Sequence, residues 1–506
     1  MVSDFFYPSM GGVETHMWSL SQCLIQRGHK VIIVTHGYGD RQGVRYMTNG
    51  LKVYYLPLTV VYDQVTLPTF FGFFGLFRSI LIREDIQIVH GHQATSTLTN
   101  ECLYYARTMG YRIVYTDHSL FGFNDVGSIH VNKVLEVLVS DIDHVICVSH
   151  ACRENLVMRG NIHPIHVSTI PNSVDTSKFL PDPSMRYPVN TVNVVMLCRL
   201  VHRKGIGLAV NVIPTICSQC PSVHFIIGGD GPMRVLLEEM REVHQLHDRV
   251  ELLGAVEHED VRDVLCRGHI FLNCSLTESF CMALLEAASC GLFVVSTKVG
   301  GVPEVLPPSM INYAEPDVSA LVDSLVEAVA VAKRINPLEL HMLLRNMYAW
   351  ADVAARTEAV YDRVANTKAV SLGERYRRYR TAGKWGCVVV CLIITCMHLL
   401  WRLWEFILPA ATIERAVDVP RLLAMASSAG GSGRAGSISP AEATLGAGRA
   451  TFSASPSPST SSSLGGSRGQ TDGRHRSGHE VSPSRGGSSS ANSSTQGRMQ
   501  ELLRRR

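Results

Sequence analysis

The sequence predicts an α/β protein with two doubly wound, Rossmann-like domains that face each other across a cleft, followed by a C-terminal transmembrane helix and a disordered tail. Three observations predict this arrangement. Short apolar runs alternate with helical segments through residues 1–345, which is typical of parallel sheets covered on both faces. The alternation restarts after a Pro- and Asp-rich linker at residues 179–188. From about residue 385 the composition changes, first to an apolar run and then to a polar region rich in Ser and Gly.

The composition limits the class of protein. A chain of 506 residues, 46% of them hydrophobic, is long enough for two or three domains with sizeable cores. The net charge of +3 gives no general reason to expect nucleic acid as a partner. The 14 cysteines are irregularly spaced, which favours a reducing, cytosolic setting for the main body over a disulfide framework.

We expect the first domain to span residues 1–188. Its first motif is Pro8-Ser9-Met10-Gly11-Gly12-Val13-Glu14, which precedes an amphipathic helix. Gly11 and Gly12 allow the backbone to approach a phosphate closely, which a Cβ atom would prevent. Only about three residues are left for the strand before this loop, which leaves room for a missing upstream extension. Further strands are expected at residues 31–34, 53–56, 86–90, 113–116 and 144–149.

Polar residues end three of these strands: His90 with His92, Asp117 with His118, and Ser149. In doubly wound sheets, ligands bind at the carboxyl ends of the strands. A lone histidine at such a place is more often structural than functional. These positions are therefore candidates for the site rather than proof of one.

Two patterns in the first domain have the residue types of a metal site. His90 and His92 would form a pair of ligands, but the sequence offers no third ligand. Asp141-Ile142-Asp143 has the form of a DxD motif, yet it closes a helix and precedes a strand instead of following one. We therefore expect no metal and no other cofactor.

We expect the second domain at residues 189–345. The buried strand Val192–Leu197 opens it and leads into Arg199 and Lys204. Arg199 offers a planar fork of donors and Lys204 a point charge, and together they suit a diphosphate. The next strand leads into Gly228-Gly229-Asp230-Gly231-Pro232, a second place where backbone can approach a ligand.

The most informative stretch runs from Leu276 to Glu286. A buried strand precedes it, and a helix that begins near Phe280 follows, so free N–H groups and the positive end of a helix dipole are available to an anion. Glu278 and Glu286 are eight residues apart, close to two helical turns, and can point into one crevice. Carboxylates beside an anion site suit a ligand with hydroxyls around its phosphates, which describes a nucleotide sugar.

These motifs, with Gly300-Gly301-Val302-Pro303-Glu304, resemble those of the retaining GT-B glycosyltransferases. The resemblance covers residues 2–364. Several stretches are similar to the family of catalytic subunits of phosphatidylinositol N-acetylglucosaminyltransferase, which starts GPI-anchor synthesis; they are residues 2–14, 117–123, 199–206, 252–265 and 278–307.

The resemblance implies a donor, UDP-GlcNAc, an acceptor, phosphatidylinositol, and retention of configuration by one member of a membrane complex that has other subunits. Glu286 would hold the ribose hydroxyls, Glu278 and His118 would position the GlcNAc ring, and Val256 would lie at the base. Positive and N–H groups would stabilise the charge left on UDP. The expected catalytic residues are Glu278, His118, Arg199 and Lys204. The expected substrate-binding residues are Gly11, Gly12, Gly229, Val256, Phe280, Cys281, Met282, Ala283 and Glu286.

Two alternatives stay open on the sequence alone. The first is a membrane-bound GT-B transferase with another sugar donor or lipid acceptor, because the glutamate pair does not distinguish these. The second is a non-catalytic subunit that binds a nucleotide sugar. The second is disfavoured because a non-catalytic subunit would not need all of the residues that the sequence contains, which are Glu278, Glu286, Arg199, Lys204 and His118.

The C-terminal region is expected to anchor the enzyme. We predict helices that cross back to the first domain at 346–370, a basic segment at 371–384, a transmembrane helix at 385–408 and a disordered tail at 409–506. Residues 385–401 contain no Asp, Glu, Lys or Arg, and Trp stands at both ends.

The charges around the apolar run predict its topology. Arg and Lys are dense at 375–384, before the run, which by the positive-inside rule places the body in the cytosol and the tail across the membrane. The family resemblance implies that this membrane is that of the endoplasmic reticulum, with the tail in its lumen. The same basic run would attract anionic headgroups. A set of phenylalanines would form either a lipid-facing surface or part of the core: Phe5, Phe6, Phe70, Phe71, Phe73 and Phe74.

Overall fold

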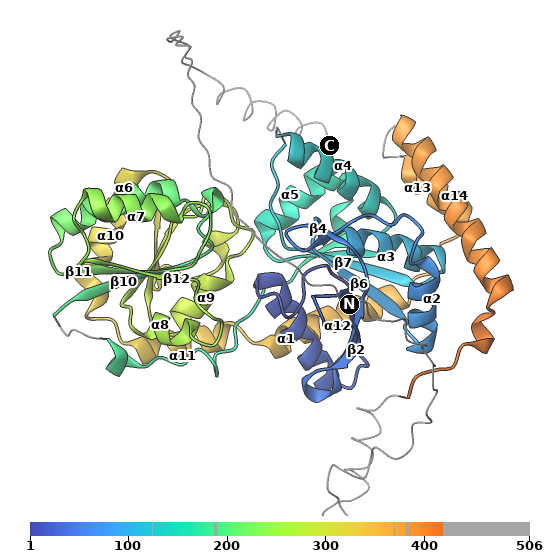
Figure 1. Ribbon diagram of the computed structural model, residues 1–506, viewed down its shortest axis with the longest axis horizontal. Helices are drawn as coiled ribbons and strands as arrows, with labels where there is room; N and C mark the ends of the chain where they lie inside the picture. The colour runs from blue at the N-terminus through green and yellow to red at the C-terminus, as the bar shows by residue number, and fades with distance from the viewer. Residues whose placement is uncertain (124, 187–189, 369, 381–383, 418–506) are drawn as a thin grey trace, which may run out of the picture. The chain divides into compact units, whose positions relative to one another are not determined.

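The computed structural model describes residues 1–123, 125–186, 190–368, 370–380 and 384–417 (Figure 1). Within these residues the chain forms two α/β lobes and a set of C-terminal helices. Residues 418–506, where the sequence predicts most of the disordered tail, lie outside the described residues.

The first lobe is built on a mainly parallel sheet. Val2 forms bridges to both Val34 and Gly91. The few residues before the loop that contains Gly11 and Gly12, the glycine loop, therefore join the two halves of this sheet. The parallel strands are β1 (Ile32–His36), β3 (Lys52–Leu56), β6 (Ile88–His92), β7 (Arg112–Asp117), β8 (His144–Cys147) and β9 (Val167–Thr169), and β2 (Gly43–Tyr46) pairs antiparallel with β3. A separate hairpin consists of β4 (Val60–Tyr62) and β5 (Val65–Thr66).

Helices of the first lobe begin where side chains satisfy their free N–H groups. The side chains of Ser96, Asp125 and Ser149 accept hydrogen bonds from the first turns of α3, α4 and α5. Each cap fixes the helix start directly after a strand or loop. The helices are α1 (Gly12–Gln26), α2 (Phe74–Arg83), α3 (Thr97–Thr108), α4 (Val126–Ser140) and α5 (His150–Gly160).

The phenylalanines divide between the core and the surface. Phe73, Phe74 and Phe77 are buried and pack around Tyr105 of α3, whereas Phe70 is 69% exposed. The sequence left the two roles open because the run at 70–77 is apolar through most of its length and has no polar face that marks the solvent side.

The second lobe has a six-stranded parallel sheet in the order β12-β11-β10-β13-β14-β15. The chain order reverses between β10 and β13, which makes this the switch point where doubly wound sheets bind ligands. The strands are β10 (Val192–Leu197), β11 (Val223–Gly228), β12 (Val250–Gly254), β13 (Ile270–Asn273), β14 (Phe293–Thr297) and β15 (Ile311–Ala314). The helices are α6 (Ile206–Gln219), α7 (Arg234–Val243), α8 (Val261–Cys266), α9 (Met282–Ser289), α10 (Val318–Ala332) and α11 (Pro337–Met347). The predicted fold class, two Rossmann-like α/β lobes, is confirmed.

Among the described residues, three α-helices follow the second lobe. The first, α12 (Trp350–Ala365), packs on α1 and β7 of the first lobe, where the Tyr361 hydroxyl lies 2.6 Å from His90 Nδ1 and Glu358 pairs with Arg27. The other two are α13 (Leu372–Tyr379) and α14 (Lys384–Ile407). Within the described residues, one helical stretch, Cys387–Ile407, is long and apolar enough to cross a membrane.

Candidate active site

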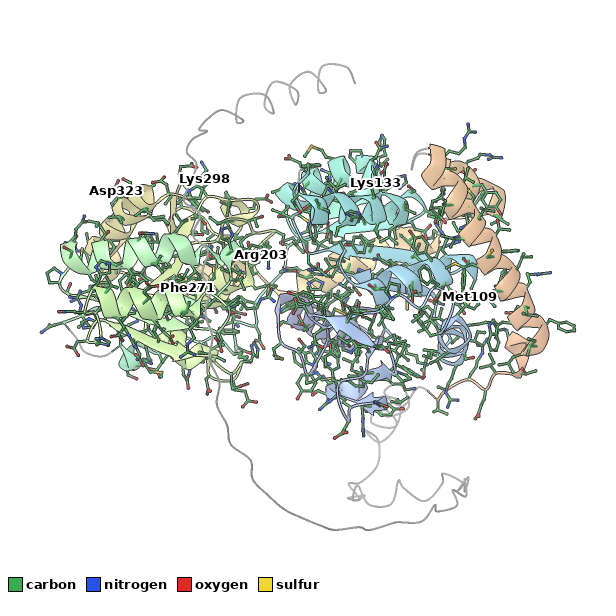
Figure 2. All side chains as sticks on the ribbon, turned by 45° about the horizontal axis from the view of Figure 1, so that its top comes forward. Met109, Lys133, Arg203, Phe271, Lys298 and Asp323 are labelled. Carbon is green, nitrogen blue, oxygen red and sulfur yellow. The ribbon has the colours of Figure 1, made fainter. Side chains whose placement is uncertain are left out.

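A pocket of about 400 Å³ opens at the switch point of the second lobe. This volume is within the usual range for small-molecule sites. Phe271 of β13, which is labelled in Figure 2, is one of its lining residues. Five residues that the sequence predicts for substrate or catalysis also line it: Arg199, Gly229, Val256, Ala283 and Glu286.

Two glycines shape the turn after β11, and the first of them, Gly229, lines the pocket. Gly229 has φ +128°, and a Cβ there would lie 1.8 Å from the carbonyl oxygen of Cys198. Gly231 has φ +152°, and a Cβ there would lie 2.5 Å from the carbonyl oxygen of Leu200. Only glycine permits this conformation and this approach. The turn after β11 is therefore held directly against the end of β10, which carries Arg199.

Lys204 and Glu278 form an ion pair between the loops that follow β10 and β13. Lys204 Nζ contacts Glu278 Oε1, and Ser275 Oγ donates a 2.8 Å hydrogen bond to the same oxygen. Burial is the largest single effect and opposes the charge on Lys204, but the charge and hydrogen bond of Glu278, together with Cys281 and Cys198, raise the pKa of Lys204. The lysine is therefore cationic and held in place beside the first of the two predicted glutamates.

Glu286 has a different environment from Glu278. Among the described residues, no hydrogen bond or ion pair to its carboxylate is found. Burial raises the pKa of Glu286 to about 7, against a smaller opposing effect of Lys178. A carboxylate that faces a pocket without a protein partner is free to accept hydrogen bonds from ligand hydroxyls.

The start of α9 brings the two lobes together. Cys281 precedes the helix with φ +73°, a conformation that is unfavourable for a residue with a side chain and is often kept at functional sites. Phe280 is buried. A Cβ on Gly12 would lie 3.8 Å from Met282 Cγ, so the glycine loop of the first lobe meets the first turn of α9.

The glycine loop differs from the prediction in one respect. The carboxylate of Glu14 folds back over Gly11, where a Cβ would be 2.7 Å from Oε2, and it accepts a 3.2 Å hydrogen bond from Ser9 Oγ. A carboxylate thus occupies the place beside Gly11 where the sequence predicts a phosphate. Burial raises the pKa of Glu14, and the charge of Arg199 lowers it by less. A diphosphate could reach this loop only after Glu14 turns away.

Arg199 lies at the rim of the pocket and is not fixed there. Its side chain is 66% exposed, and its Nη1 atom is 4.0 Å from the carboxylate of Asp63 in the β4–β5 hairpin. Such an exposed contact holds a side chain weakly. Arg199 can therefore turn toward an anion in the pocket.

His118 belongs to a cluster of three imidazoles with His16 and His92. His92 Nδ1 is 3.2 Å from His118 Nε2, and His16 Nδ1 is 2.8 Å from Asn172 Oδ1. Burial lowers the pKa of His16 to about 4 and the pKa values of His92 and His118 well below the usual value. All three are therefore neutral at physiological pH.

The cluster is the one set of described residues with the composition of a metal site, since its three ligand nitrogens lie within 4.8 Å of one another. The sequence paired His92 with His90 and missed His16. His90 bonds instead to Tyr361 and Thr116. The available signal was the short distance in sequence between His16 and the glycine loop.

Hydrogen bonds join the loop of Glu278 to the first lobe beside His118. Ser279 Oγ donates to the carbonyl oxygen of His118, and Ser149 Oγ donates a 2.6 Å hydrogen bond to the carbonyl oxygen of Ser279. The ends of β7 and β8 thus meet the loop that precedes α9. The structure therefore brings His118, Glu278, Lys204 and the start of α9 to one region.

Two family models match the chain. Residues 36–125 match the model described as PIGA (GPI anchor biosynthesis), and residues 191–330 match the model described as glycosyl transferases group 1.

The chain is also similar to curated proteins over most of their lengths. It is 54% identical over 419 residues to a phosphatidylinositol N-acetylglucosaminyltransferase subunit of Arabidopsis thaliana, which covers 83% of this chain and 94% of the relative. It is 50% identical over 422 residues to the protein of the same name from Homo sapiens, which covers 83% of this chain and 87% of that relative. The gpi3 subunit of the same transferase from Schizosaccharomyces pombe is 51% identical, covering 83% and 92%.

Solved structures share the fold at low identity. Sucrose-phosphate synthase from Thermosynechococcus elongatus superposes with a TM-score of 0.61 at 19% identity, covering 70% of this chain and 94% of that one. The catalytic domain of starch synthase IV from Arabidopsis thaliana, bound to ADP and acarbose, gives 0.57 at 17% identity, covering 72% and 99%.

Proposed function

Because this chain belongs to the family of phosphatidylinositol N-acetylglucosaminyltransferase subunits to which these relatives belong, glycosyltransferases of GPI-anchor biosynthesis, we propose that it transfers GlcNAc from UDP-GlcNAc to phosphatidylinositol with retention of configuration. The observation that carries the proposal is identity of 54% over 94% of a relative with that name. The pocket at the switch point of the second lobe supports it, because its lining suits a nucleotide sugar.

On the donor side, the residues divide between binding and charge stabilisation. Glu286 would accept hydrogen bonds from the ribose hydroxyls, with Val256 beside the base. Lys204 and Arg199, with the N–H groups of Phe280, Cys281, Met282 and Ala283, would stabilise the negative charge that develops on UDP as the anomeric bond breaks. The amides of Gly11 and Gly12 would join them once Glu14 has turned away.

At the reacting carbon, His118 and Glu278 would position the GlcNAc ring of the donor. The bond between the anomeric carbon and the UDP oxygen breaks, and a bond from the same carbon to the inositol oxygen forms on the same face. The proton of that hydroxyl passes to the leaving phosphate, so the transfer needs no protein base. Because Glu278 is paired with Lys204, its carboxylate is suited to position the sugar and not to act as a nucleophile.

We propose that the transfer is independent of metal, because the cations of Lys204 and Arg199 and the N–H groups at the start of α9 serve the departing phosphate. Activity should then survive EDTA in the complete membrane complex. Loss of activity with EDTA and recovery with zinc would instead assign a role to the cluster of His16, His92 and His118.

For location, family membership and helix α14 support a place in a complex of the endoplasmic reticulum membrane, with the catalytic body in the cytosol. If α14 crosses the bilayer, the tail lies in the lumen, where Asn492 in Asn492-Ser493-Ser494 can be glycosylated. A shift in mobility on endoglycosidase treatment supports this topology. Glycosylation at Asn273 of the second lobe would contradict it.

The direct test is a microsome assay with labelled UDP-sugars and phosphatidylinositol, with and without this chain. We expect labelled GlcNAc in the lipid fraction only with the chain and only from UDP-GlcNAc. Transfer from another sugar nucleotide or to another lipid would replace the proposed substrates. Full activity without the chain would show that it is not the catalytic subunit.

A further inference from the structure

Asp141, which the sequence presents as half of a DxD pattern, is the centre of a buried polar cluster. It is 1% exposed and lies between α4 and β8. Its neighbour Asp143 is bound by Arg107, whose two terminal nitrogens lie 3.0 and 2.8 Å from the carboxylate. Arg107 also donates to the backbone carbonyl of Asp141. Both residues of the DxD pattern therefore form hydrogen bonds within the protein, and the Asp141 carboxylate faces α13.

Helix α13 supplies further partners of the Asp141 carboxylate, whose Oδ1 also lies 3.4 Å from Arg107 Nε. Arg375 Nε donates a 2.6 Å hydrogen bond to Oδ2, and Tyr379 OH donates one of 3.2 Å to the same oxygen. Arg375 Nη1 also donates to Thr108 Oγ1, at the end of α3, at 3.2 Å. Arg375 and Tyr379 are 3% and 1% exposed. The first arginine of the basic segment is thus an internal residue of the first lobe, contrary to the expectation that the whole run is available to lipid headgroups.

Helix α14 packs against α13 and against the same end of α3. Tyr376 OH of α13 lies 2.6 Å from Thr395 Oγ1, which joins the two helices, and Met397 packs on Thr108 with a distance of 3.6 Å from Oγ1 to Sδ. Met109, labelled in Figure 2, marks this end of α3 beside α14. The arginine of α13 and the middle of α14 therefore converge on one residue of α3.

Further along, α14 packs on α2. A Cβ on Gly75 would lie 2.3 Å from the ring of Trp404, so the indole is in direct contact with the α2 backbone. One turn on, the fully buried Arg78 donates to Glu405 at 2.7 Å. A buried arginine needs such a partner. The helix is thus in contact with the first lobe at both of these places.

The opposite side of α14 is apolar and has no partner among the described residues. A helix of this length and composition has the chemistry of a bilayer contact. No other part of the described chain covers it. Its exposed residues include Val388, Leu392, Leu399, Leu403 and Phe406, which are between 51% and 84% exposed.

We propose that Asp141 and Arg375 form a clamp that fixes the first lobe on the membrane-facing helices α13 and α14, and that this clamp orients the lobe for transfer to a lipid held in the bilayer. The inference rests on the proposed function, because it concerns the same reaction. Asp141 and Arg375 act as positioning residues, since neither touches the pocket of the second lobe. Without the clamp, the lobe can tilt on its anchor, and the cleft no longer meets the headgroup in a fixed orientation.

The test compares Arg375→Met with Arg377→Met in the complete complex, reconstituted in liposomes. Arg377 is on the same helix, but its side chain is 75% exposed and pairs with Glu374 of that helix. The two variants lose the same charge, so the comparison separates the clamp from the general attraction of basic residues to lipid. Each complex is assayed with long-chain phosphatidylinositol in the bilayer and with a water-soluble, short-chain phosphatidylinositol.

We expect Arg375→Met to lower transfer to the bilayer lipid by about 10-fold or more and to leave transfer to the soluble acceptor within about 2-fold, while Arg377→Met changes neither. Equal losses with both acceptors would mean a structural role, and no loss would mean that the clamp is dispensable; either result overturns the proposal. If Arg375→Met does not assemble, Tyr379→Phe, which removes one hydrogen bond, should shift the ratio of the two activities in the same direction. If the wild type transfers to neither acceptor, the proposed function itself fails.

Discussion

Glu286 lines the pocket with a carboxylate that has no partner among the described residues, and this predicts a loss of nucleotide affinity on truncation. Glu286→Ala should weaken UDP binding by about 10- to 100-fold, because hydrogen bonds from ribose to a charged acceptor are lost. The turnover of bound donor should change less. Titration calorimetry with UDP, compared with single-turnover rates, measures the two effects separately. An unchanged affinity would remove Glu286 from the ribose site.

The raised pKa of Glu286, about 7, also predicts a dependence of stability on pH. The folded, ligand-free protein binds this proton more tightly than the unfolded chain does, so the contribution of Glu286 to stability falls as pH rises from about 4.5 to about 7. Glu286→Gln cannot ionise and escapes this loss. Its stability relative to wild type should therefore increase between pH 5 and pH 8, by about 1–2 kcal/mol after allowance for water in the pocket. Thermal unfolding of both ligand-free proteins at the two pH values measures this change in relative stability. The same difference in stability at pH 5 and pH 8 would contradict a raised pKa for Glu286.

At the scale of elements, the turn after β11 depends on a glycine. Gly229→Ala places a Cβ 1.8 Å from the carbonyl oxygen of Cys198 at φ +128°, so the turn must move away from the end of β10. We expect a loss of about 2 kcal/mol or more in stability, together with weaker donor binding. Gly207→Ala is the control, because Gly207 lies in α6, where an added Cβ would meet no other part of the protein within 4 Å, and the change should be neutral or slightly stabilising. Equal melting temperatures for the two variants would contradict the role of the turn.

The elements also show what could be predicted from the sequence. Most strands of the second lobe were predictable because they are short apolar runs followed by glycine or polar residues, and β10, with Arg199 after it, is an example. The edge strand β15 was not predicted. The packing of α13 and α14 on the first lobe was not predictable. It depends on Asp141 meeting Arg375, which are 234 residues apart in the chain, and nothing local in either segment signals the other.

The site also has features that could be predicted from the sequence and features that could not. The glutamate pair and the basic residues after β10 follow from their positions beside strands, and the structure places Lys204 and Glu278 in contact. Two features were missed because they depend on side-chain direction. One is the turn of the Glu14 carboxylate over Gly11, and the other is the approach of His16 to His92 and His118.

Across the molecule as a whole, the contact between the lobes includes a carboxylate that caps a helix. Glu304 of the second lobe accepts hydrogen bonds from the backbone N–H groups of His150 and Ala151, at 2.6 and 2.8 Å, at the start of α5 in the first lobe. Negative charge at a helix N-terminus is favourable. The contact therefore stabilises the arrangement of the lobes in which His118 lies beside the loop of Glu278.

Glu304→Ala should loosen this arrangement and lower kcat/KM for UDP-GlcNAc by about 10-fold, with little change in stability, because exposed groups are removed and the cores are not. Glu315→Ala, another exposed glutamate of the second lobe, should leave kcat/KM unchanged. Steady-state assays of both variants in the complete complex provide the comparison. If the two variants behave alike, the capping contact has no part in the reaction.

The proposed chemistry depends above all on Lys204 and Arg199 stabilising the charge on the departing UDP. The decisive experiment measures the single-turnover rate of GlcNAc transfer to phosphatidylinositol by the complex that contains Arg199→Ala, Lys204→Ala or both. We expect a fall of about 10²-fold or more for each single variant at saturating UDP-GlcNAc. Transfer at the wild-type rate by the double variant would show that these two cations do not serve the leaving group.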